Sequence, residues 1–478
     1  MEPKTLYNLF DPGTERFVNI KHRERDEDCV REGSGSDNID FVPQSRKVYE
    51  SFGFVPLETP GMENRKVLLG NTDNFNKSIF LARIVRGIED KKIANDSWDQ
   101  DYTLRFDLTV PLARVIAAYP DLPKPFKRYQ IGKVWRGERP QAGRYREFSQ
   151  FDFDIIGSNS ILADIEVIQV MYQSMKALGI DNFLIRFNTR KILNGLAEAV
   201  NCLDNSKELF RIIDKLDKIG LTGVKSELMR QPANEYDDTA LAMTENKAEK
   251  VIAFLQIKSE SSDDVLVKLQ DFFGDSDDLG QSGLYELQKI SKALTDLNIP
   301  QKNWKIDLSV ARGLDYYTGP VFETTLTDIP EIGSVFSGGR FDGLTNRFIA
   351  GSNIAGVGAS VGIDRLIVAL QKLGLIDKRD SVTDVLVTIF DPELQKYSMD
   401  MVQELQQNGY NTELYLGDDY TFRAQFSYAA KKSIPFVVII GPEEMASGKI
   451  QLKDMNARKQ ELLTKEECFA NLKSSLGK

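Results

Sequence analysis

The middle of the chain, about residues 161–300, repeats apolar residues at the spacing of helices. Side chains three or four positions apart share one helix face, so each series predicts an amphipathic helix that packs by that face. The first series ends at Gly220, which we expect to stop its helix. The two series are Leu209, Ile212, Ile213, Leu216 and Ile219, then Leu284, Leu287, Ile290, Leu294 and Leu297 before Pro300.

Residues 101–157 are instead rich in aromatic and β-branched residues and predict antiparallel strands. The clearest strand runs from Arg146 to Ile155, because its side chains alternate in character. One face is apolar and is expected to be buried; it carries Phe151, Phe153 and Ile155. The other face carries Arg146, Phe148, Gln150, Asp152 and Asp154. Such side chains would be costly in an ordinary core, so this face is either solvated or part of a binding site.

The remaining patterns divide the chain. Residues 21–38 are nearly all charged, Gly, Ser or Asn and predict a mobile arm, and a helix is expected from Ser45 to about Gly53. After Lys378 the pattern alternates strand, helix, strand, helix, strand, which predicts a small α/β domain with a mainly parallel sheet. We therefore expect a strand-rich domain that is interrupted by a helical module over residues 194–299.

Composition limits the classes of function. The chain has 478 residues, of which 41% are apolar and 28% charged, an ordinary balance for a globular protein of about three domains. Its net charge is −10, so a nucleic-acid partner would need local basic patches. The three cysteines are far apart, and the single histidine, His22, stands among charges. A disulfide framework, a histidine-based metal cluster and Ser-His-Asp catalysis are therefore not expected.

The sequence carries no sign of a membrane span or of a secretory signal. No apolar run approaches the ~18 residues that a membrane helix needs. The first 17 residues have scattered charges and no apolar centre. We expect a soluble protein of the cytoplasm.

Four arginines crowd one predicted hairpin: Arg136, Arg139, Arg144 and Arg146. Their guanidinium groups would repel each other if unpaired, whereas a triphosphate offers planar acceptors that arginine suits. Phe148, on the polar face of the following strand, could stack on a base. The alternative is a surface salt-bridge cluster with Glu138 and Glu147.

Arg365 gives a second indication of an anionic ligand. It follows a predicted glycine-rich strand and begins a predicted helix, IDRLIVAL. An arginine at the start of a helix opposes the helix dipole unless an anion is bound there. The surrounding glycines fit neither a P-loop nor a dinucleotide-binding motif. Arg365 therefore mildly favours ligand binding over packing.

Five stretches of the chain resemble the histidyl-tRNA synthetases, a family of class II aminoacyl-tRNA synthetases. They occur in that family's order and at compatible spacing, and the resemblance covers about residues 41–478. ARGLDYYTG is peculiar to this family, whereas the arginine-bearing motifs 2 and 3 occur across class II. The stretches are LRFDLTVPLAR (104–114), VWRGERP with GRYREFSQFDFDIIG (134–157), ARGLDYYTGPVFE (311–323), GGRFDGL (338–344) and GVGASVGIDRL (356–366).

The resemblance implies an α/β fold in which helices flank the antiparallel sheet of an α+β class II catalytic domain. A helical insertion and a C-terminal α/β anticodon-binding domain are implied as well. The expected domains are a partly disordered arm (1–40), the catalytic domain (41–193 plus 300–376), the insertion (194–299) and the anticodon-binding domain (380–478). Motif 1, here SRKVYESFGFVPLETP, builds the dimer interface in class II enzymes, so a homodimer is also implied.

The resemblance also implies roles for individual residues. Those that hold the amino acid, with carboxylates at its ammonium and imidazole, are Asp107, Leu108, Thr109, Arg136, Gln150, Asp154, Arg312, Tyr316 and Tyr317. Those that bind ATP are Arg136, Glu138, Arg144, Phe148 and Arg365. Arg136 and Arg312 are the catalytic pair at the α-phosphate. No protein metal site is implied, because Mg²⁺ would be held mostly by ATP phosphates and water.

The implied activity is that of a histidine–tRNA ligase, which activates L-histidine with ATP and transfers the histidyl group to the 3′ end of tRNA-His. The attacking carboxylate is already ionised and needs no general base, so a chain with one histidine can run this chemistry. The C-terminal domain would read the tRNA anticodon. Positive charge there comes from Lys431, Lys432, Lys449, Lys453, Arg458 and Lys459, unless these are ordinary surface cations.

The chain departs from the family pattern at two places, and two alternative functions remain to be considered. PGTERF at 12–17 matches the family's start only loosely, and Phe341 stands where the family usually has tyrosine, which removes a hydroxyl near the substrate. One rival is a catalytically inactive, synthetase-like regulatory protein, which the complete set of site residues disfavours. The other is a class II synthetase for another amino acid, which ARGLDYYTG disfavours. Histidine-dependent ATP–pyrophosphate exchange separates all three.

Overall fold

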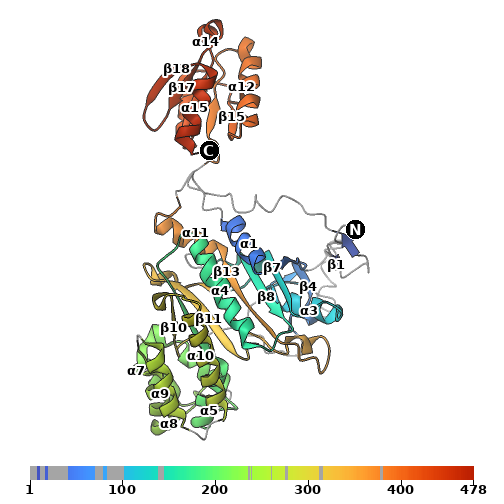
Figure 1. Cartoon of the computed structure of the whole chain (residues 1–478), viewed down its shortest axis with the longest axis vertical. Coiled ribbons are helices and arrows are strands. Elements are labelled where there is room, and N and C mark those ends of the chain that lie inside the picture. Colours follow the sequence, from blue (N-terminus) through green and yellow to red (C-terminus); the bar gives the residue numbers. More distant parts are fainter. Residues whose placement is uncertain are drawn as a thin grey trace. The chain divides into compact units, whose positions relative to one another are not determined.

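The protein forms two compact units, one over Pro43–Ala369 and one over Leu370–Lys478 (Figure 1). The computed structural model describes residues 8–10, 17–19, 41–69, 79–82, 102–137, 145–234, 237, 239–259, 261–274, 278–311, 316–376 and 381–477. Most of the predicted arm lies outside these residues, apart from the paired strands β1 (Asn8–Phe10) and β2 (Phe17–Asn19). Within the described part, no helix is long and apolar enough to span a membrane.

A large sheet forms the centre of the first unit. Its strands are β3 (Val55–Pro56), β7 (Phe126–Trp135), β8 (Glu147–Ile156), β9 (Phe183–Thr189), β10 (Trp304–Ile306), β11 (Pro320–Leu326), β12 (Ser334–Arg340) and β13 (Gly356–Gly362). Their order in space is β10-β9-β11-β12-β13-β8-β7-β3. The inner neighbours are antiparallel, as predicted, and the two outermost pairs are parallel.

Helices cover the apolar face of this sheet. The helices α1 (Phe41–Ser51) and α4 (Ile161–Ala177) lie there, and α4 crosses β12 and β13. Tyr49 of α1 packs its ring against Phe151 and Phe153, with 4.5 and 4.7 Å between ring centroids. The prediction that this face of β8 is buried is therefore confirmed. The helix α11 (Ile363–Lys372) follows β13 directly, as the sequence predicted.

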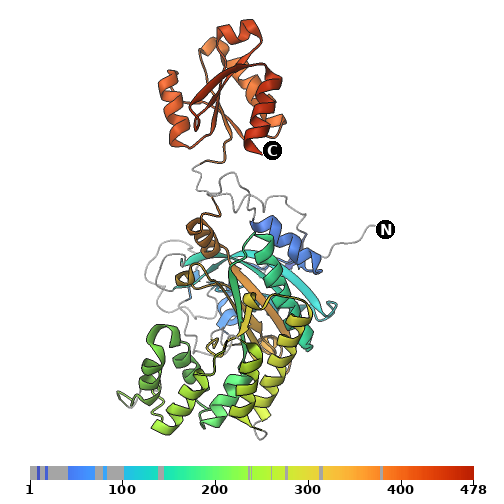
Figure 2. The ribbon, with the colours of Figure 1, turned by 60° about the vertical axis from the view of Figure 1, so that its left-hand side comes forward.

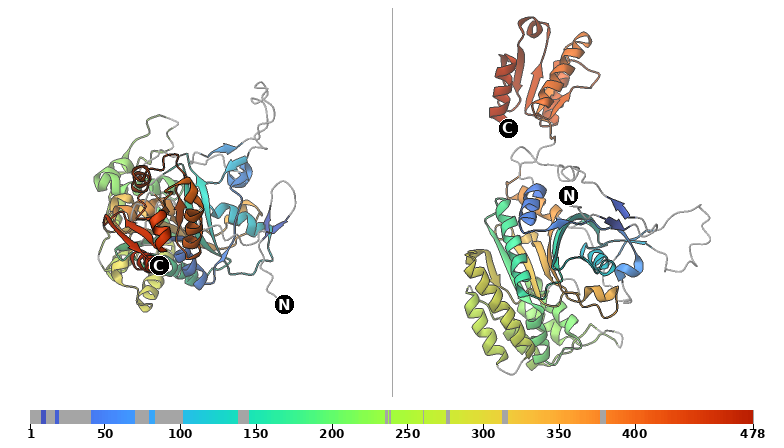
Figure 3. Two further views of the ribbon diagram at one scale, coloured as in Figure 1. Left: turned by 90° about the horizontal axis from the view of Figure 1, so that it is seen from above. Right: turned by 45° about the vertical axis from the view of Figure 1, so that its right-hand side comes forward.

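The other side of the sheet carries α3 (Thr109–Ala118), opposite α4 (Figure 3). The prediction of strands throughout 101–157 is wrong here. Asp107 Oδ1 accepts a hydrogen bond from the Val110 backbone nitrogen at 3.1 Å and so satisfies a donor of the first helical turn. Val110, Leu112, Ala113 and Ile116 of the helix are buried, and this packing outweighs the β-branched composition. Beside α3 lie α2 (Arg65–Leu69) and a small sheet of β4 (Met62–Asn64), β6 (Tyr102–Leu104) and β5 (Leu81–Ala82).

The helices between β9 and β10 pack together beside the sheet (Figure 2). They are α5 (Arg190–Ala199), α6 (Ser206–Ile213), α7 (Leu216–Met229), α8 (Glu245–Leu255), α9 (Ser262–Phe273) and α10 (Asp278–Asp296). Gly220 stops the helical backbone, as predicted. Its φ of +66° and ψ of 175° are not helical, a conformation that glycine adopts without a Cβ penalty, and a second helical segment of α7 begins after it.

The second unit is a five-stranded sheet with helices on both faces. Its strands are β14 (Val385–Val387), β15 (Thr412–Leu414), β16 (Phe436–Ile439), β17 (Ile450–Asp454) and β18 (Lys459–Leu463), in the order β15-β14-β16-β17-β18. Its helices are α12 (Gln395–Gln407), α13 (Phe422–Lys431), α14 (Pro442–Ser447) and α15 (Lys465–Leu476). The predicted alternation over the first three strands is confirmed. The sheet is mixed rather than mainly parallel, because β17 and β18 add an antiparallel hairpin.

Candidate active site

The polar face of β8 is buried. Gln150, Asp152 and Asp154 are 9%, 4% and 2% exposed, so the alternative of a solvated outer face is wrong for these three residues. The strands β7 and β13 pair with β8 on either side. Buried amide and carboxylate groups need partners, and those partners define the site.

Arg128 of β7 is the buried partner that the sequence interpretation missed. It lies directly across from Asp154 in the strand register, and 2.8 Å separates its Nη2 from Asp154 Oδ2. The same Nη2 donates to the Leu108 carbonyl oxygen at 2.9 Å. Arg128 thus links Asp154 to the segment that precedes α3. An arginine in the apolar strand of a predicted hairpin, facing a polar row, was the signal that could have found it.

The two carboxylates of β8 lie in an environment of low polarity. Ser360, the register partner of Asp152 on β13, donates its hydroxyl to Asp152 Oδ1. Burial raises the pKa of Asp152 to about 7 and that of Asp154 to about 6, and Arg128 opposes both shifts. The negative charge of Asp107 raises both values further. A cation bound beside these groups would favour their charged forms.

Asp107 joins this cluster from the start of α3. Its Oδ2 accepts a hydrogen bond from the Tyr316 hydroxyl at 2.9 Å, while its Oδ1 caps the helix. The rings of Tyr316 and Tyr317 meet edge to face, with 5.3 Å between centroids. Burial raises the pKa of both tyrosines, and the neighbouring carboxylates add to the shift. Both hydroxyls are therefore protonated at neutral pH and can donate hydrogen bonds.

Two glycines allow these groups to approach each other. A Cβ at Gly358 would lie 2.2 Å from Asp154 Oδ1, and a Cβ at Gly339 would lie 3.0 Å from the ring of Tyr317. Either side chain would displace a residue of the site. Glycine at these strand positions is thus required by space.

Gln150 has an acceptor that the protein does not use. Its Oε1 atom is buried and has no hydrogen-bond partner among the described residues. An unpaired buried acceptor is costly, so this oxygen suits a donor supplied by a bound molecule. Leu108 and Thr109, next to Asp107 in the chain, are buried as well.

Arg136 stands at the end of β7, beside this cluster. Its Nε donates to the Phe106 carbonyl oxygen at 3.0 Å, and its guanidinium carbon lies 5.1 Å from the centroid of the Phe148 ring. Besides burial, the three carboxylates of Asp107, Asp152 and Asp154, here called the acidic cluster, raise the pKa of Tyr317, and the positive charge of Arg136 opposes that rise. A guanidinium over a half-buried aromatic ring suits a ligand that combines a phosphate with a base.

Comparison with known proteins decides the family. The family model described as histidyl-tRNA synthetase matches residues 42–366. The chain belongs to the histidyl-tRNA synthetase family. A second family model, described as an anticodon binding domain, matches residues 384–475.

Sequence similarity to members of the histidyl-tRNA synthetase family extends over most of the chain. A histidine–tRNA ligase of Helicobacter pylori (strain HPAG1) is 42% identical over 86% of this chain and 89% of its own length. One of Clostridium tetani is 40% identical over 90% and 93%. The crystal structure of histidyl-tRNA synthetase from Nostoc sp. PCC 7120 is 33% identical, covers 91% of this chain and 94% of that chain, and has a TM-score of 0.74. A structure described as an ATP phosphoribosyltransferase regulatory subunit/histidyl-tRNA synthetase from Bacillus halodurans C is 20% identical over 81% and 91%, with a TM-score of 0.62, and shares the fold.

The residues that the family resemblance implied fall into three groups. Those that lie in or next to the acidic cluster are Asp107, Leu108, Thr109, Arg136, Phe148 (beside Arg136), Gln150, Asp154, Tyr316 and Tyr317. Arg365 lies on α11, and its Nη1 donates to the Ser334 carbonyl oxygen at 2.6 Å. Glu138, Arg144 and Arg312 lie outside the described residues. Their roles stay predictions.

Two further observations concern the histidyl-tRNA synthetase pattern. Phe341, which stands where the family usually has tyrosine, is buried and lies 6.0 Å from Tyr316 between ring centroids. In the part of the chain that the structure describes, no group of three or more His, Cys, Asp or Glu residues could hold a metal ion.

Proposed function

We propose that this chain is a histidine–tRNA ligase. It activates L-histidine with ATP to histidyl-adenylate and pyrophosphate, and then transfers the histidyl group to the 3′ end of tRNA-His. The observation that carries the proposal is the buried cluster of Asp107, Gln150 and Asp154 under two tyrosines, with Arg136 and Phe148 beside it. Family membership supports the same activity.

The acidic cluster supports the ammonium group of an amino acid as its ligand. Asp107, Asp152 and Asp154 are all buried, and Arg128 forms the ion pair with Asp154. Buried carboxylates are costly unless a cation balances them, and the ammonium group of an amino acid supplies one. The unused Oε1 atom of Gln150 would accept from the same ligand, and the tyrosine rings would enclose a flat side chain such as imidazole.

The first step needs no general base from the protein. The carboxylate of histidine attacks the α-phosphate of ATP in line, and pyrophosphate leaves. Arg136 and Arg312 stabilise the charge on the transferring group, and Arg365 reaches the γ-phosphate. Glu138, Arg144 and Phe148 help to seat ATP, with the adenine stacked on Phe148. Mg²⁺ would be held mainly by ATP and water and would supply positive charge to the phosphates. These assignments follow the family resemblance, and the position of Arg136 next to Phe148 supports them.

In the second step a ribose hydroxyl of the tRNA attacks the acyl carbon of the adenylate, and AMP leaves. The match of the second unit to an anticodon binding domain supports tRNA-His as the partner. At least three of its six proposed RNA-facing cations also have side-chain contacts within that unit. Lys432 Nζ lies 2.5 Å from Glu413 Oε1, Lys453 Nζ lies 3.8 Å from the centroid of the Phe426 ring, and Lys459 pairs with Glu461.

We also propose a homodimer in the cytoplasm. Apolar side chains near motif 1 support the dimer, because Val55, Met62 and Leu81 of β3, β4 and β5 are 40%, 52% and 47% exposed. A second copy of the chain would bury them. Sedimentation equilibrium at micromolar concentration measures the mass directly.

The decisive test is ATP–pyrophosphate exchange with each of the twenty amino acids. The expected result is exchange with L-histidine alone, followed by charging of tRNA-His. Exchange with a different amino acid would identify another class II synthetase. A folded protein that exchanges with no amino acid would support the inactive regulatory alternative.

A further inference from the structure

Tyr316 and Tyr317 lie in a loop that precedes β11, and the loop is held from two sides. On the side of the site, the Tyr316 hydroxyl donates to Asp107. On the other side, the next residue along, Thr318, donates its backbone nitrogen to the Arg340 carbonyl oxygen at 2.8 Å. The position of the tyrosines therefore depends on how firmly Arg340 is held.

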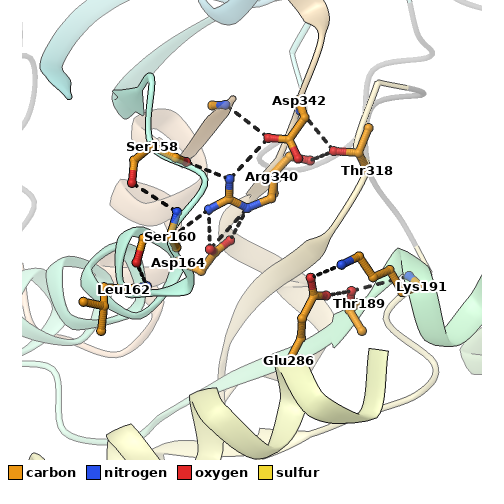
Figure 4. Close-up of polar contacts among 11 residues, drawn as sticks. Ser158, Ser160, Leu162, Asp164, Thr189, Lys191, Glu286, Thr318, Arg340 and Asp342 are labelled. Carbon is orange, nitrogen blue, oxygen red and sulfur yellow. Dashed lines mark hydrogen bonds and ion pairs between the residues drawn. The ribbon is translucent and has the colours of Figure 1, made fainter. Parts of the chain in front are cut away.

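Arg340 ends β12 and is 6% exposed (Figure 4). Its Nε donates to Asp164 Oδ1 at 3.0 Å, and its Nη2 pairs with the second oxygen of the same carboxylate. Asp164 lies in the first turn of α4 and is fully buried. Two further guanidinium hydrogens go to the carbonyl oxygens of Ser158 and Ser160, at 3.0 and 3.2 Å. This fork binds β12 to the start of α4, on the far side of the sheet from α3.

A second set of contacts closes a ring around Thr318. Arg340 Nη1 donates to Asp342 Oδ1 at 3.2 Å, and the same oxygen accepts from the Gly356 backbone nitrogen at 3.3 Å. The backbone nitrogen of Asp342 donates to Thr318 Oγ1 at 3.0 Å. Figure 4 shows Asp342 between Arg340 and Thr318, facing both. Thr318 is thus fixed through its backbone by Arg340 and through its hydroxyl by Asp342.

Packing joins the same residues. A Cβ at Gly319 would lie 2.9 Å from Arg340 Cδ, so the loop rests on the arginine side chain itself. Gly339, the residue before Arg340, contacts the Tyr317 ring with equally little space. Thr318 is itself exposed, but its backbone nitrogen and its hydroxyl both have hydrogen-bond partners. A change at Arg340 therefore reaches the tyrosines by displacing the loop.

We propose that Arg340, anchored by Asp164 and acting through Thr318, is a positioning residue for amino-acid recognition: it holds Tyr316 and Tyr317 at the acidic cluster. The proposal rests on the proposed function, because it concerns the amino-acid site of that reaction. A role in stability alone would lower the melting temperature and leave substrate affinities unchanged. A positioning role weakens binding of the amino acid and leaves binding of ATP as it was.

The experiment measures KM for histidine and for ATP, and kcat, in pyrophosphate exchange by the full chain. Thr318→Val removes the hydroxyl that accepts from Asp342, and Thr318→Ser restores it. We expect Thr318→Val and Arg340→Lys to raise the KM for histidine by roughly ten- to hundredfold, with less than about twofold change in the KM for ATP. Thr318→Ser should return the value to near that of the wild type.

A matched control lies next to this network in Figure 4. Glu286 of α10 accepts from the Thr189 hydroxyl at 2.6 Å and pairs with Lys191 at 2.6 Å, without a contact to the loop among its described interactions. Glu286→Gln should lower the melting temperature and leave both KM values unchanged. If Thr318→Val behaves like Glu286→Gln, the proposal is overturned. If the wild type shows no histidine-dependent exchange, the proposed function fails instead.

Discussion

The guanidinium of Arg128 makes an ion pair of 2.8 Å with Asp154 and also holds the Leu108 carbonyl oxygen at 2.9 Å. Both side chains are almost completely buried. One arginine thereby connects the strand that carries Gln150 and Asp154 to the segment that carries Asp107. The two segments that form the acidic cluster are thus joined by a group that contacts neither Tyr316 nor Tyr317 in any described interaction.

Arg128→Met should strongly destabilise the protein. The change removes one partner of a buried ion pair and leaves Asp154 without compensation, which costs about 3–5 kcal/mol. Urea unfolding measures the loss. Arg211→Met is the matched control, because the Arg211–Glu208 pair is exposed and should contribute only about 0–1 kcal/mol. Equal losses for the two variants would contradict the role assigned to Arg128.

Stability without ligand should fall as the pH rises from about 4 to about 7. The pKa values of Asp152, about 7, and Asp154, about 6, lie above the ordinary 3.8, so the folded chain binds more protons than the unfolded chain in this window. Asp152→Asn removes the larger contribution and keeps an acceptor for Ser360. The melting temperature of Asp152→Asn, relative to that of the wild type, should therefore increase as the pH rises from 5 to about 8.

Asp237→Asn provides the control for this pH dependence. Hydrogen bonds from Arg230 and Thr239 lower the pKa of Asp237, so its stabilisation is complete well below pH 5. The difference in melting temperature between Asp237→Asn and the wild type should stay constant over the pH range in which the difference for Asp152→Asn grows. A constant difference for Asp152→Asn as well would show that Asp152 does not titrate in that range.

Arg136→Lys should slow histidine-dependent exchange by roughly 10²–10³-fold, the scale of losing one preorganised charge donor. Lysine keeps the charge but cannot reproduce the planar fork that bonds Phe106 and lies over Phe148. Stopped-flow or isotope-exchange rates at saturating substrates measure the effect. Lys133→Met, an exposed cation on the same strand, should change the rate little. An equally small change for Arg136→Lys would contradict the role proposed for Arg136 in the reaction.

Deletion of residues 380–478 should reduce tRNA charging far more than histidine-dependent exchange. The expectation rests on the two compact units, each with its own core, of which the first carries the acidic cluster. Exchange reports adenylate formation alone, whereas charging also needs the tRNA to bind. A parallel loss of both activities, in a truncated chain that still melts cooperatively, would contradict the assignment of anticodon binding to the second unit.

Strong local periodicity accounts for the elements that the sequence predicted well. The alternation of β8 is nearly complete, and its two faces are those expected, because side chains in a strand must alternate. The helix α3 was missed because the tertiary packing of its buried side chains overrides the β-branched composition of the segment. The hairpin of β17 and β18 was missed because its exposed strand, KQELL, carries little apolar pattern.

The residues of the candidate site can also be divided into those that the sequence predicted and those that it missed. Asp107, Gln150, Asp154 and the two tyrosines were predicted from the resemblance and from the polar face of one strand. The partners Arg128, Ser360 and Arg340 were not, because Ser360 lies 208 residues from Asp152 and Arg340 lies 176 residues from Asp164. Pairings over such separations leave no local periodicity.

The sequence by itself determined which chemical groups are present and which face of each regular element they occupy, since both follow from residue type and backbone repeat. Only the tertiary structure decided which carboxylate meets which guanidinium. The reason is physical: such contacts form when the large sheet brings distant strands into register, and burial then gives them their strength.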